Sequence, residues 1–274
     1  MELNYHFEDN GQTETIVILH GFLSDKSSMA TTAAELDGIR NVITVDLPGF
    51  GQSKSTGRDY GIETIADALA AMLESLTITR ADVYGYSMGG RVALSFAINH
   101  PDHVNRLILE SSSPGIASEE ERAMRRQVDQ TRADEILRDY PAFISQWETL
   151  PLFSTQAAMP RDQQARQREN RLAQKPEEVA DSLLKYGTGV QPSYWTKLSQ
   201  LHMPILLAVG GEDQKFIDIN TRMALHMPDA RLEIIEGAGH NIHMEAGPKF
   251  GILLLDYLSG GMNDGKRMAN DSRI

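Results

Sequence analysis

The sequence contains no cysteine, which excludes disulfide bonds and thiolate metal sites. Its longest apolar stretches, TIVIL (15–19) and ILLLDYL (252–258), have the length of a strand or a short helix and are too short to cross a membrane. The first residues, MELNYHFEDNGQTE, contain neither a basic start nor an apolar segment, so no signal peptide is expected. We therefore expect a cytoplasmic protein with no membrane partner.

Positive charge is scarce and unevenly placed. The 26 basic and 38 acidic residues give a net charge of −12, which argues against a nucleic-acid partner. Nine of the eighteen arginines nevertheless fall between residues 115 and 200. An acidic protein that concentrates guanidinium groups in one segment is expected to bind an anionic ligand there. A monomer or a weak homo-oligomer is expected.

Short β-branched runs alternate with segments of helical periodicity. Apolar residues recur at helical spacing between Ile62 and Leu76, and the segments 91–99 and 250–258 behave likewise. Strand and helix in alternation predict a parallel sheet covered on both faces, an α/β fold. The predicted buried strands are 15–19, 41–46, 81–85, 104–110, 204–210 and 230–235.

This alternation stops between about residues 115 and 200, where charged helical segments carry no strand signal. Because the strand pattern resumes afterwards, the segment is predicted to be a helical cap inserted above the strand ends. The expected organisation is a core of residues 1–114 and 201–260, a cap of residues 115–200, and a disordered tail of residues 261–274.

The stretch GYSMGG (85–90) places Ser87 in a G-x-S-x-G pattern between a predicted strand and a predicted helix. A strand-turn-helix of this kind presents a serine hydroxyl on a strained, exposed turn. Ser87 is therefore predicted to be a nucleophile or a base, the alternative being an idle serine in a glycine-rich turn.

A reactive serine needs a base, and the base needs an orienting carboxylate. Asp213 follows a predicted strand in AVGGEDQKF, and His240 follows the next strand in EGAGHNIHMEAGP. The order Ser87, Asp213, His240 is that of the α/β-hydrolases. The competing residues are His243 for the base, and Glu212 and Asp218 for the carboxylate, while Asp213 could also be a simple helix N-cap.

Two further features complete the predicted machinery. The backbone N–H groups of Phe22, in LHGFLSD, and Met88 are expected to form an oxyanion hole. Arg91 lies four residues after Ser87, on the same helix face, where a guanidinium suits a carboxylate. The alternative is that Arg91 pairs with an acid under the insertion.

No metal or cofactor is expected. His20, His240 and His243 are the only clustered imidazoles, and they lack a ligand spacing with accompanying acids.

Five ordered motifs, LHGF, VDLPGFGQS (45–53), GYSMGG, GGEDQKF (210–216) and GAGHNIHME (237–245), resemble the α/β-hydrolase fold superfamily. The chain from about residue 3 to 259, including segments 111–129, 143–153, 166–173 and 186–195 of the insertion, most resembles the 2-succinyl-6-hydroxy-2,4-cyclohexadiene-1-carboxylate synthases of menaquinone biosynthesis. The substrate contacts implied by this resemblance are Tyr86, Arg91, Arg125, Trp147 and Arg168. The register leaves Arg122 and Arg126 as alternatives to Arg125, and both could simply form intrahelical pairs with glutamates.

The resemblance implies a lyase that expels pyruvate from a small polycarboxylate, with Ser87 as the base activated by His240 and Asp213. One alternative is a carboxylesterase or C–C bond hydrolase that forms an acyl-serine. A second is a non-catalytic binding protein that has kept the pocket.

Overall fold

The computed structural model describes residues 1–57 and 59–260. The predicted disordered tail, residues 261–274, lies outside the described residues.

A seven-stranded sheet forms the centre of the molecule, with the strand order β1-β3-β2-β4-β5-β6-β7. β1 pairs with β3 antiparallel and the other neighbours pair in parallel. The predicted α/β class is therefore confirmed. The strands are β1 (Asn4–Glu8), β2 (Thr15–Leu19), β3 (Asn41–Asp46), β4 (Ala81–Tyr86), β5 (Val104–Glu110), β6 (Ile205–Gly210) and β7 (Ala230–Ile235).

β1 was not predicted from the sequence, and the reason is its place at the edge of the sheet. Its five residues, NYHFE, are only half-buried or exposed, so they lack the continuous apolar run that identified β2 and β3. The six predicted strands match the observed ones to within one residue at each end.

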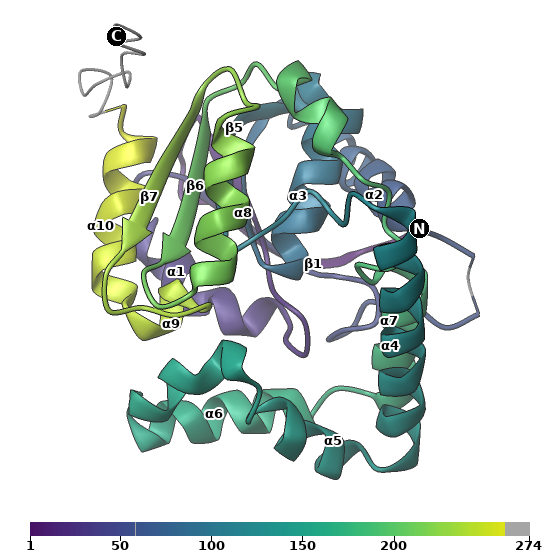
Figure 1. Cartoon of the computed structure of the whole chain (residues 1–274). Coiled ribbons are helices and arrows are strands. Elements are labelled where there is room, and N and C mark those ends of the chain that lie inside the picture. The colour runs from purple at the N-terminus through teal and green to yellow at the C-terminus, as the bar shows by residue number, and fades with distance from the viewer. Residues whose placement is uncertain (58, 261–274) are drawn as a thin grey trace, which may run out of the picture.

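Helices cover both faces of the sheet, as Figure 1 shows. One face packs against α2 (Ile62–Ser75), α3 (Met88–Asn99) and α8 (Gln214–Ala224). The other face packs against α1 (Ala30–Glu35), α9 (Ile242–Glu245) and α10 (Gly247–Leu258). The short 3-10 turns η1 (Lys26–Met29), η2 (Pro101–His103) and η4 (Trp195–Gln200) complete the core connections.

The segment between β5 and β6 is helical, as its charged periodicity predicted. It comprises α4 (Glu119–Arg138), α5 (Tyr140–Trp147), η3 (Pro151–Ala158), α6 (Arg161–Leu172) and α7 (Pro176–Tyr186). α4 begins at Ser118, whose side chain accepts a hydrogen bond from the Glu121 N–H, and three glutamates in its first turn complement the helix dipole. In Figure 1 these helices lie beyond the end of the sheet to which the arrows of β6 and β7 point.

Polar contacts tie this cap to the core. Asp25 Oδ2 accepts hydrogen bonds from Asn170 Nδ2 at 3.1 Å and from Gln174 Nε2 at 2.9 Å. The Tyr186 hydroxyl donates to the Pro48 carbonyl at 2.7 Å. Because parallel sheets bind ligands at the carboxyl ends of their strands, the cap covers the place where a site is expected.

No helix of residues 1–57 and 59–260 is long and apolar enough to cross a membrane.

Candidate active site

Ser87 occupies a strained turn between β4 and α3, with φ of 51°. The turn is possible because its neighbours have no side chain: a Cβ on Gly85 would lie 2.4 Å from the Gly89 carbonyl oxygen, and one on Gly89 would lie 2.3 Å from the Leu19 carbonyl oxygen. The glycines of the G-x-S-x-G pattern are therefore required by the close approach of neighbouring backbone.

Hydrogen bonds hold this turn on both sides. The Ser87 N–H donates to the Glu110 carbonyl at 2.8 Å, and the Ser87 carbonyl accepts from the Arg91 N–H at 3.1 Å. The Ser112 hydroxyl also donates to the Ser87 carbonyl at 3.1 Å. Several hydrogen bonds thus hold the strained backbone of Ser87 in place at once, which is how such conformations persist at reactive sites.

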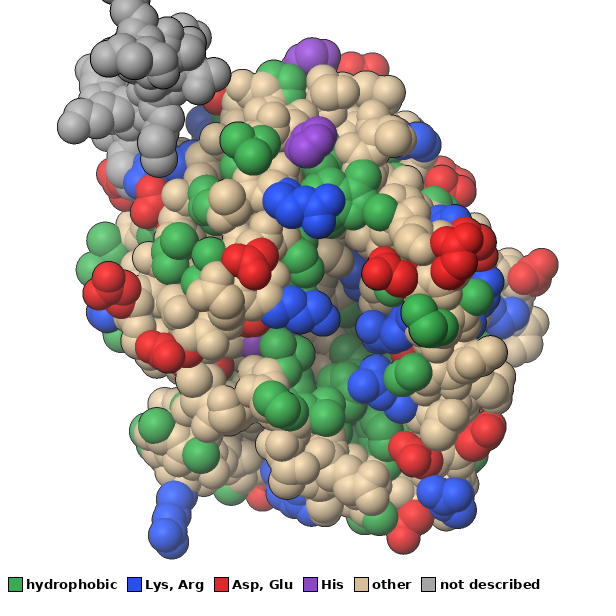
Figure 2. Space-filling model, in the orientation of Figure 1, with side chains coloured by type: hydrophobic (Ala, Val, Ile, Leu, Met, Phe, Trp, Pro, Cys, Tyr) green, Lys and Arg blue, Asp and Glu red, His purple; other side chains and the backbone are tan. Residues whose placement is uncertain are grey.

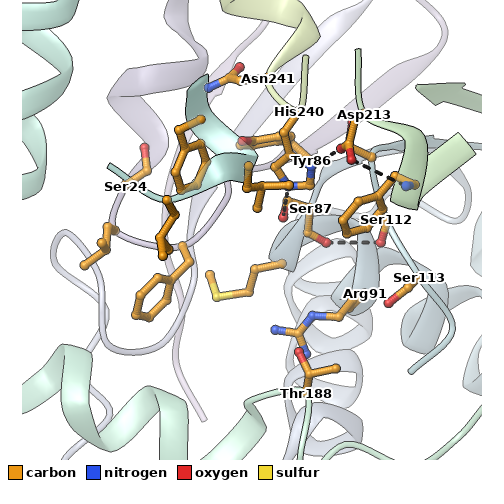
Figure 3. Close-up of a pocket in the computed structure, with 18 of the residues that line it drawn as sticks. Ser24, Tyr86, Ser87, Arg91, Ser112, Ser113, Thr188, Asp213, His240 and Asn241 are labelled. Carbon is orange, nitrogen blue, oxygen red and sulfur yellow. Dashed lines mark hydrogen bonds and ion pairs between the residues drawn. The ribbon is translucent and has the colours of Figure 1, made fainter. Parts of the chain in front are cut away.

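Ser87, His240 and Asp213 form one hydrogen-bonded chain (Figure 3). Ser87 Oγ lies 2.9 Å from His240 Nε2, and His240 Nδ1 lies 2.7 Å from Asp213 Oδ2. His240 and Asp213 are buried. This is the geometry of a serine activated by an imidazole that a carboxylate orients.

The competing residues have other partners. His243 Nδ1 lies 2.8 Å from Glu110 Oε2, and Asp218 Oδ1 accepts a hydrogen bond from Gln214 at 2.8 Å. Glu212 is exposed. Asp213 also caps α8, where it accepts from the Phe216 N–H at 3.4 Å, so its N-cap role and its contact with His240 coexist.

A cavity of about 920 Å³ opens beside Ser87, between the core and the cap. Figure 2 shows the hollow on this face, with hydrophobic side chains on its floor and Lys and Arg side chains along its margin. Six of the residues named from the sequence line it in addition to the triad: Phe22, Met88, Tyr86, Arg91, Arg125 and Trp147.

The loop that carries Phe22 is anchored by His20, which is fully buried. His20 Nδ1 lies 2.7 Å from the Gly21 carbonyl, and His20 Nε2 accepts a hydrogen bond from the Leu47 N–H at 3.0 Å. Burial lowers the pKa of His20, which keeps the ring neutral. A neutral imidazole has one nitrogen that donates and one that accepts, as these two contacts require. The loop and the first turn of α3, where Met88 lies, thus meet at the cavity.

Arg91 reaches the cavity without a carboxylate partner. Its Nη1 donates to the Tyr186 carbonyl at 2.9 Å and to Gln191 Oε1 at 2.6 Å, both neutral acceptors. No ion pair involves Arg91 within the part of the chain that the structure describes. Burial, together with the nearby charge of Arg125, lowers the pKa of Arg91 to about 10. The site therefore holds an uncompensated positive charge one helical turn from Ser87.

The three arginines of α4 that the sequence left as alternatives, Arg122, Arg125 and Arg126, differ in their position relative to the cavity. Arg122 and Arg126 both pair with Glu119, and Arg126 also donates to the Gly189 carbonyl at 3.0 Å. Neither lines the cavity, whereas Arg125 does. Helical rotation explains the difference, because successive side chains on a helix point about 100° apart.

Trp147 lies in an aromatic cluster at the junction of cap and core. Its ring centroid is 5.2 Å from that of Phe22 and 5.7 Å from that of Phe153. It therefore joins the cap to the loop that carries the predicted oxyanion donor.

Arg168 does not line the cavity, and its expected contact with substrate stays a prediction. Its guanidinium pairs with Glu148 and donates to Ser145 Oγ at 2.9 Å. The cavity face of α6 is formed by Arg166, Gln167, Asn170 and Arg171. Arg168 lies beyond the edge of that face, as the rotation of about 100° per residue requires.

Sequence reasoning missed four arginines that line the cavity: Arg166 and Arg222, which are exposed, and Arg132 and Arg171, which are not. Arg132 lines the cavity and lies over the Trp147 ring, with 5.4 Å between its Cζ and the ring centroid. Arg171 is buried, lines the cavity and pairs with Glu148 at 2.9 Å. The seven-residue spacing of Arg125 and Arg132, two turns of one helix face, was the available signal.

Tyr86 lines the same cavity. Its ring stacks edge-on against His243 at 4.9 Å and lies 5.6 Å from the ring of His240. Burial raises the pKa of Tyr86 well above its ordinary value, so the hydroxyl stays protonated and able to donate.

A family model described as the alpha/beta hydrolase fold matches residues 14–247 of this chain. The chain belongs to the α/β-hydrolase fold family. Its relatives in that family include a Bacillus subtilis protein provisionally named 2-succinyl-6-hydroxy-2,4-cyclohexadiene-1-carboxylate synthase, which is 37% identical over 94% of this chain and 95% of its own.

Two further relatives within the α/β-hydrolase fold bear on the choice of chemistry. The solved structure of MenH from S. aureus has 35% sequence identity and a TM-score of 0.91, and the match covers 96% of this chain and 100% of that one. A 2-hydroxy-6-oxononadienedioate/2-hydroxy-6-oxononatrienedioate hydrolase of Burkholderia vietnamiensis is 30% identical over 94% of this chain and 91% of its own.

Proposed function

We propose that this protein is a lyase that eliminates pyruvate from 2-succinyl-5-enolpyruvyl-6-hydroxy-3-cyclohexene-1-carboxylate. The product would be 2-succinyl-6-hydroxy-2,4-cyclohexadiene-1-carboxylate, an intermediate of menaquinone biosynthesis. The relative from Bacillus subtilis, similar over nearly the whole chain, carries the name of this activity.

The observation that carries the proposal is the uncompensated Arg91 beside Ser87. An esterase with neutral substrates gains nothing from a half-buried guanidinium held only by carbonyl oxygens. A substrate carboxylate placed there would satisfy the charge with a bidentate pair. It would also fix the ring relative to Ser87, and such positioning supplies much of the rate gain in an oriented reaction.

In the proposed reaction Ser87 Oγ, made basic by His240, removes the ring proton at C2, which is alpha to the ketone carbonyl of the 2-succinyl group. The C–H electron pair enters the ring system, and the backbone N–H groups of Phe22 and Met88 stabilise the dienolate-like charge. The C–O bond to the enolpyruvyl group then breaks, and the departing enolate takes up a proton to become pyruvate. His240, charged after accepting the serine proton, is stabilised by Asp213 at 2.7 Å.

A second function is favoured by a specific comparison. The Burkholderia vietnamiensis relative is named a hydrolase of dicarboxylate substrates and is 30% identical. A C–C bond hydrolase or carboxylesterase would use the same triad through an acyl-serine, with water as the second reactant.

The test follows pyruvate release together with the rise of diene absorbance from the cyclohexene precursor. Wild-type protein should produce both in equal amounts, and Ser87→Ala should abolish both. Ser75→Ala is a matched control, because the Ser75 hydroxyl donates to the Met72 carbonyl at the end of α2, outside the cavity lining. The lyase proposal fails if the precursor is not converted while small aryl esters are hydrolysed and an acyl-serine is trapped by mass spectrometry.

A further inference from the structure

The loop that carries Phe22 has a strained backbone next to the predicted oxyanion donor. Leu23, a buried residue that directly follows Phe22, has φ of 61°, a value that residues other than glycine rarely adopt. Within residues 1–57 and 59–260 the Phe22 N–H has no hydrogen-bond acceptor, so it is free to donate to an oxyanion. A strained turn of this kind keeps its geometry only where its surroundings hold it in place.

Asp25, three residues after Phe22, connects this loop to the cap. Its Oδ1 accepts hydrogen bonds from the Ser27 N–H at 2.9 Å and from the Ser27 hydroxyl at 2.5 Å, both within the loop. Its Oδ2 accepts from Asn170 Nδ2 at 3.1 Å and from Gln174 Nε2 at 2.9 Å, which lie at the end of α6 and just beyond it. One carboxylate oxygen thus shapes the loop, and the other holds the loop against the cap.

Gln174 fixes the direction of this contact. It is buried, and its Oε1 accepts from the Gly51 N–H at 2.9 Å while its Nε2 donates to Asp25. The amide therefore cannot turn its oxygen toward Asp25 without placing its own NH2 group against the Gly51 N–H. Although partial burial opposes ionisation, the hydrogen bonds that it accepts lower the pKa of Asp25, so a carboxylate is present to accept them.

The cap contacts the loop on both sides of the strained residue. Before Leu23, the ring of Phe22 packs against that of Trp147 in the cap, with 5.2 Å between the ring centroids. After Leu23, Asp25 accepts the two amide hydrogen bonds of the cap. Neither Asp25 nor Gln174 lines the cavity, so a substrate bound beside the reactive serine touches neither of them. Their effect on the reaction must therefore pass through the loop.

We infer that Asp25 is a positioning residue for the proposed reaction. By joining the strained turn to the cap, it holds the Phe22 N–H where this group can donate to the dienolate-like charge that develops on the substrate. The oxyanion site is therefore complete only while α6 lies against the loop. The inference rests on the proposed function, because it gives Asp25 a part in the same elimination.

The first test compares kcat and KM of Asp25→Asn with those of wild type on the cyclohexene precursor. An amide has only one acceptor oxygen, so either the Ser27 N–H or the amides of the cap lose their acceptor. We expect kcat to fall about ten- to a hundredfold, the order of loss that follows a misplacement of about 1 Å. KM should change little, because Asp25 does not line the cavity. An unchanged kcat, or a raised KM at unchanged kcat, would overturn the inference.

A reciprocal exchange separates this contact from a general effect of changing Asp25. Gln174→Glu alone places two carboxylates together and should lower kcat as Asp25→Asn does. In the double variant, the new carboxylate at position 174 can accept from the Gly51 N–H and from the new amide at position 25. The contact is then restored with its donor and acceptor exchanged, so most of the lost kcat should return. Losses that simply multiply in the double variant would refute the role of this pair.

Glu178→Gln is the matched control, because Glu178 joins the cap to a different loop of the core. It lies in α7, outside the cavity lining, and accepts from the Thr56 N–H at 3.0 Å and from the Thr56 hydroxyl at 2.7 Å. Its kcat should stay close to that of wild type, because the Phe22 loop is untouched. All variants are assayed at a temperature at which circular dichroism shows them folded. A loss of kcat equal to that of Asp25→Asn would mean that any loosening of the cap has this effect, and would overturn the specific role of Asp25.

The two proposals fail in different ways. If wild-type protein hydrolyses a small aryl ester but does not convert the precursor, the lyase is rejected. The same variants are then compared on the ester, whose tetrahedral intermediate uses the same oxyanion site. If the precursor is converted and Asp25→Asn leaves kcat unchanged, the lyase stands and the positioning role of Asp25 is rejected. Absence of both activities in wild type would reject both proposals.

Discussion

The carbonyl of Glu110 accepts a hydrogen bond from the Ser87 N–H at 2.8 Å, so the last residue of β5 holds the reactive turn at the end of β4. The side chain of the same Glu110 lies on the buried side, where it accepts from the His243 N–H at 3.1 Å and binds the Tyr84 hydroxyl. One residue thus joins the turn to the loop that carries His240.

Replacing Glu110 should cost stability more than catalysis. Glu110→Ala would leave His243 and Tyr84 buried without their acceptor, a loss of about 3 kcal/mol. The backbone contact to Ser87 does not depend on the side chain, so kcat should survive below the melting temperature. Thermal unfolding and kcat at 15 °C would check this, with the exposed Glu236→Ala as control. A collapse of kcat in a fully folded variant would contradict it.

Arg91→Lys should reduce kcat/KM for a carboxylate substrate by about ten- to a hundredfold, because lysine keeps the charge but loses the planar fork. Hydrolysis of a neutral aryl ester, if present, should change little. Steady-state kinetics on both substrates provides the comparison. Equal losses of kcat/KM on the carboxylate substrate and the aryl ester would instead indicate that the substitution displaces Ser87.

Gly89→Ala should severely reduce the yield of folded protein, because the new Cβ would lie 2.3 Å from the Leu19 carbonyl and 2.5 Å from the His20 carbonyl, both backbone atoms. Gly247→Ala, where a Cβ meets nothing within 4 Å, should be neutral or slightly stabilising. Denaturant unfolding of the two variants distinguishes a specific packing requirement from a general intolerance of glycine replacement.

Acidification should destabilise the protein partly through His20. Burial lowers its pKa in the folded state, so below about pH 6.5 the unfolded chain binds a proton that the folded chain does not. The stabilisation that neutral, buried His20 contributes is therefore fully present above about pH 6.5, and it is lost as the pH falls toward the pKa of His20 in the folded state. His20→Gln should be less stable than wild type at pH 7.5, with a smaller gap at pH 5.5. A gap of constant size would contradict the prediction.

Much of the fold followed from local pattern, because buried strands are continuous apolar runs and Ser87 sits between a strand and a helix. The edge strand Asn4–Glu8 was missed because its half-exposed residues depend on pairing with β3, which no local pattern encodes. The triad was predictable because strand ends of a parallel sheet converge. Of the cap arginines that line the cavity, only Arg125 was named from the sequence, since the rotation of α4 and α6 against the core decides that Arg132 enters the cavity and Arg168 does not.

The cap leaves the core after β5 and returns before β6, and its two ends meet: the Tyr194 N–H donates to the Pro114 carbonyl at 2.8 Å, and the Trp195 indole N–H donates to the Gly115 carbonyl at 3.0 Å. Loop-closure cost grows only slowly with the length of the segment between these ends. Ser87, Asp213 and His240 all belong to the core. Evolution can accordingly lengthen, trim or exchange the inserted segment while the reacting groups keep their places, so a lineage of such proteins can acquire new substrates without reinventing its chemistry.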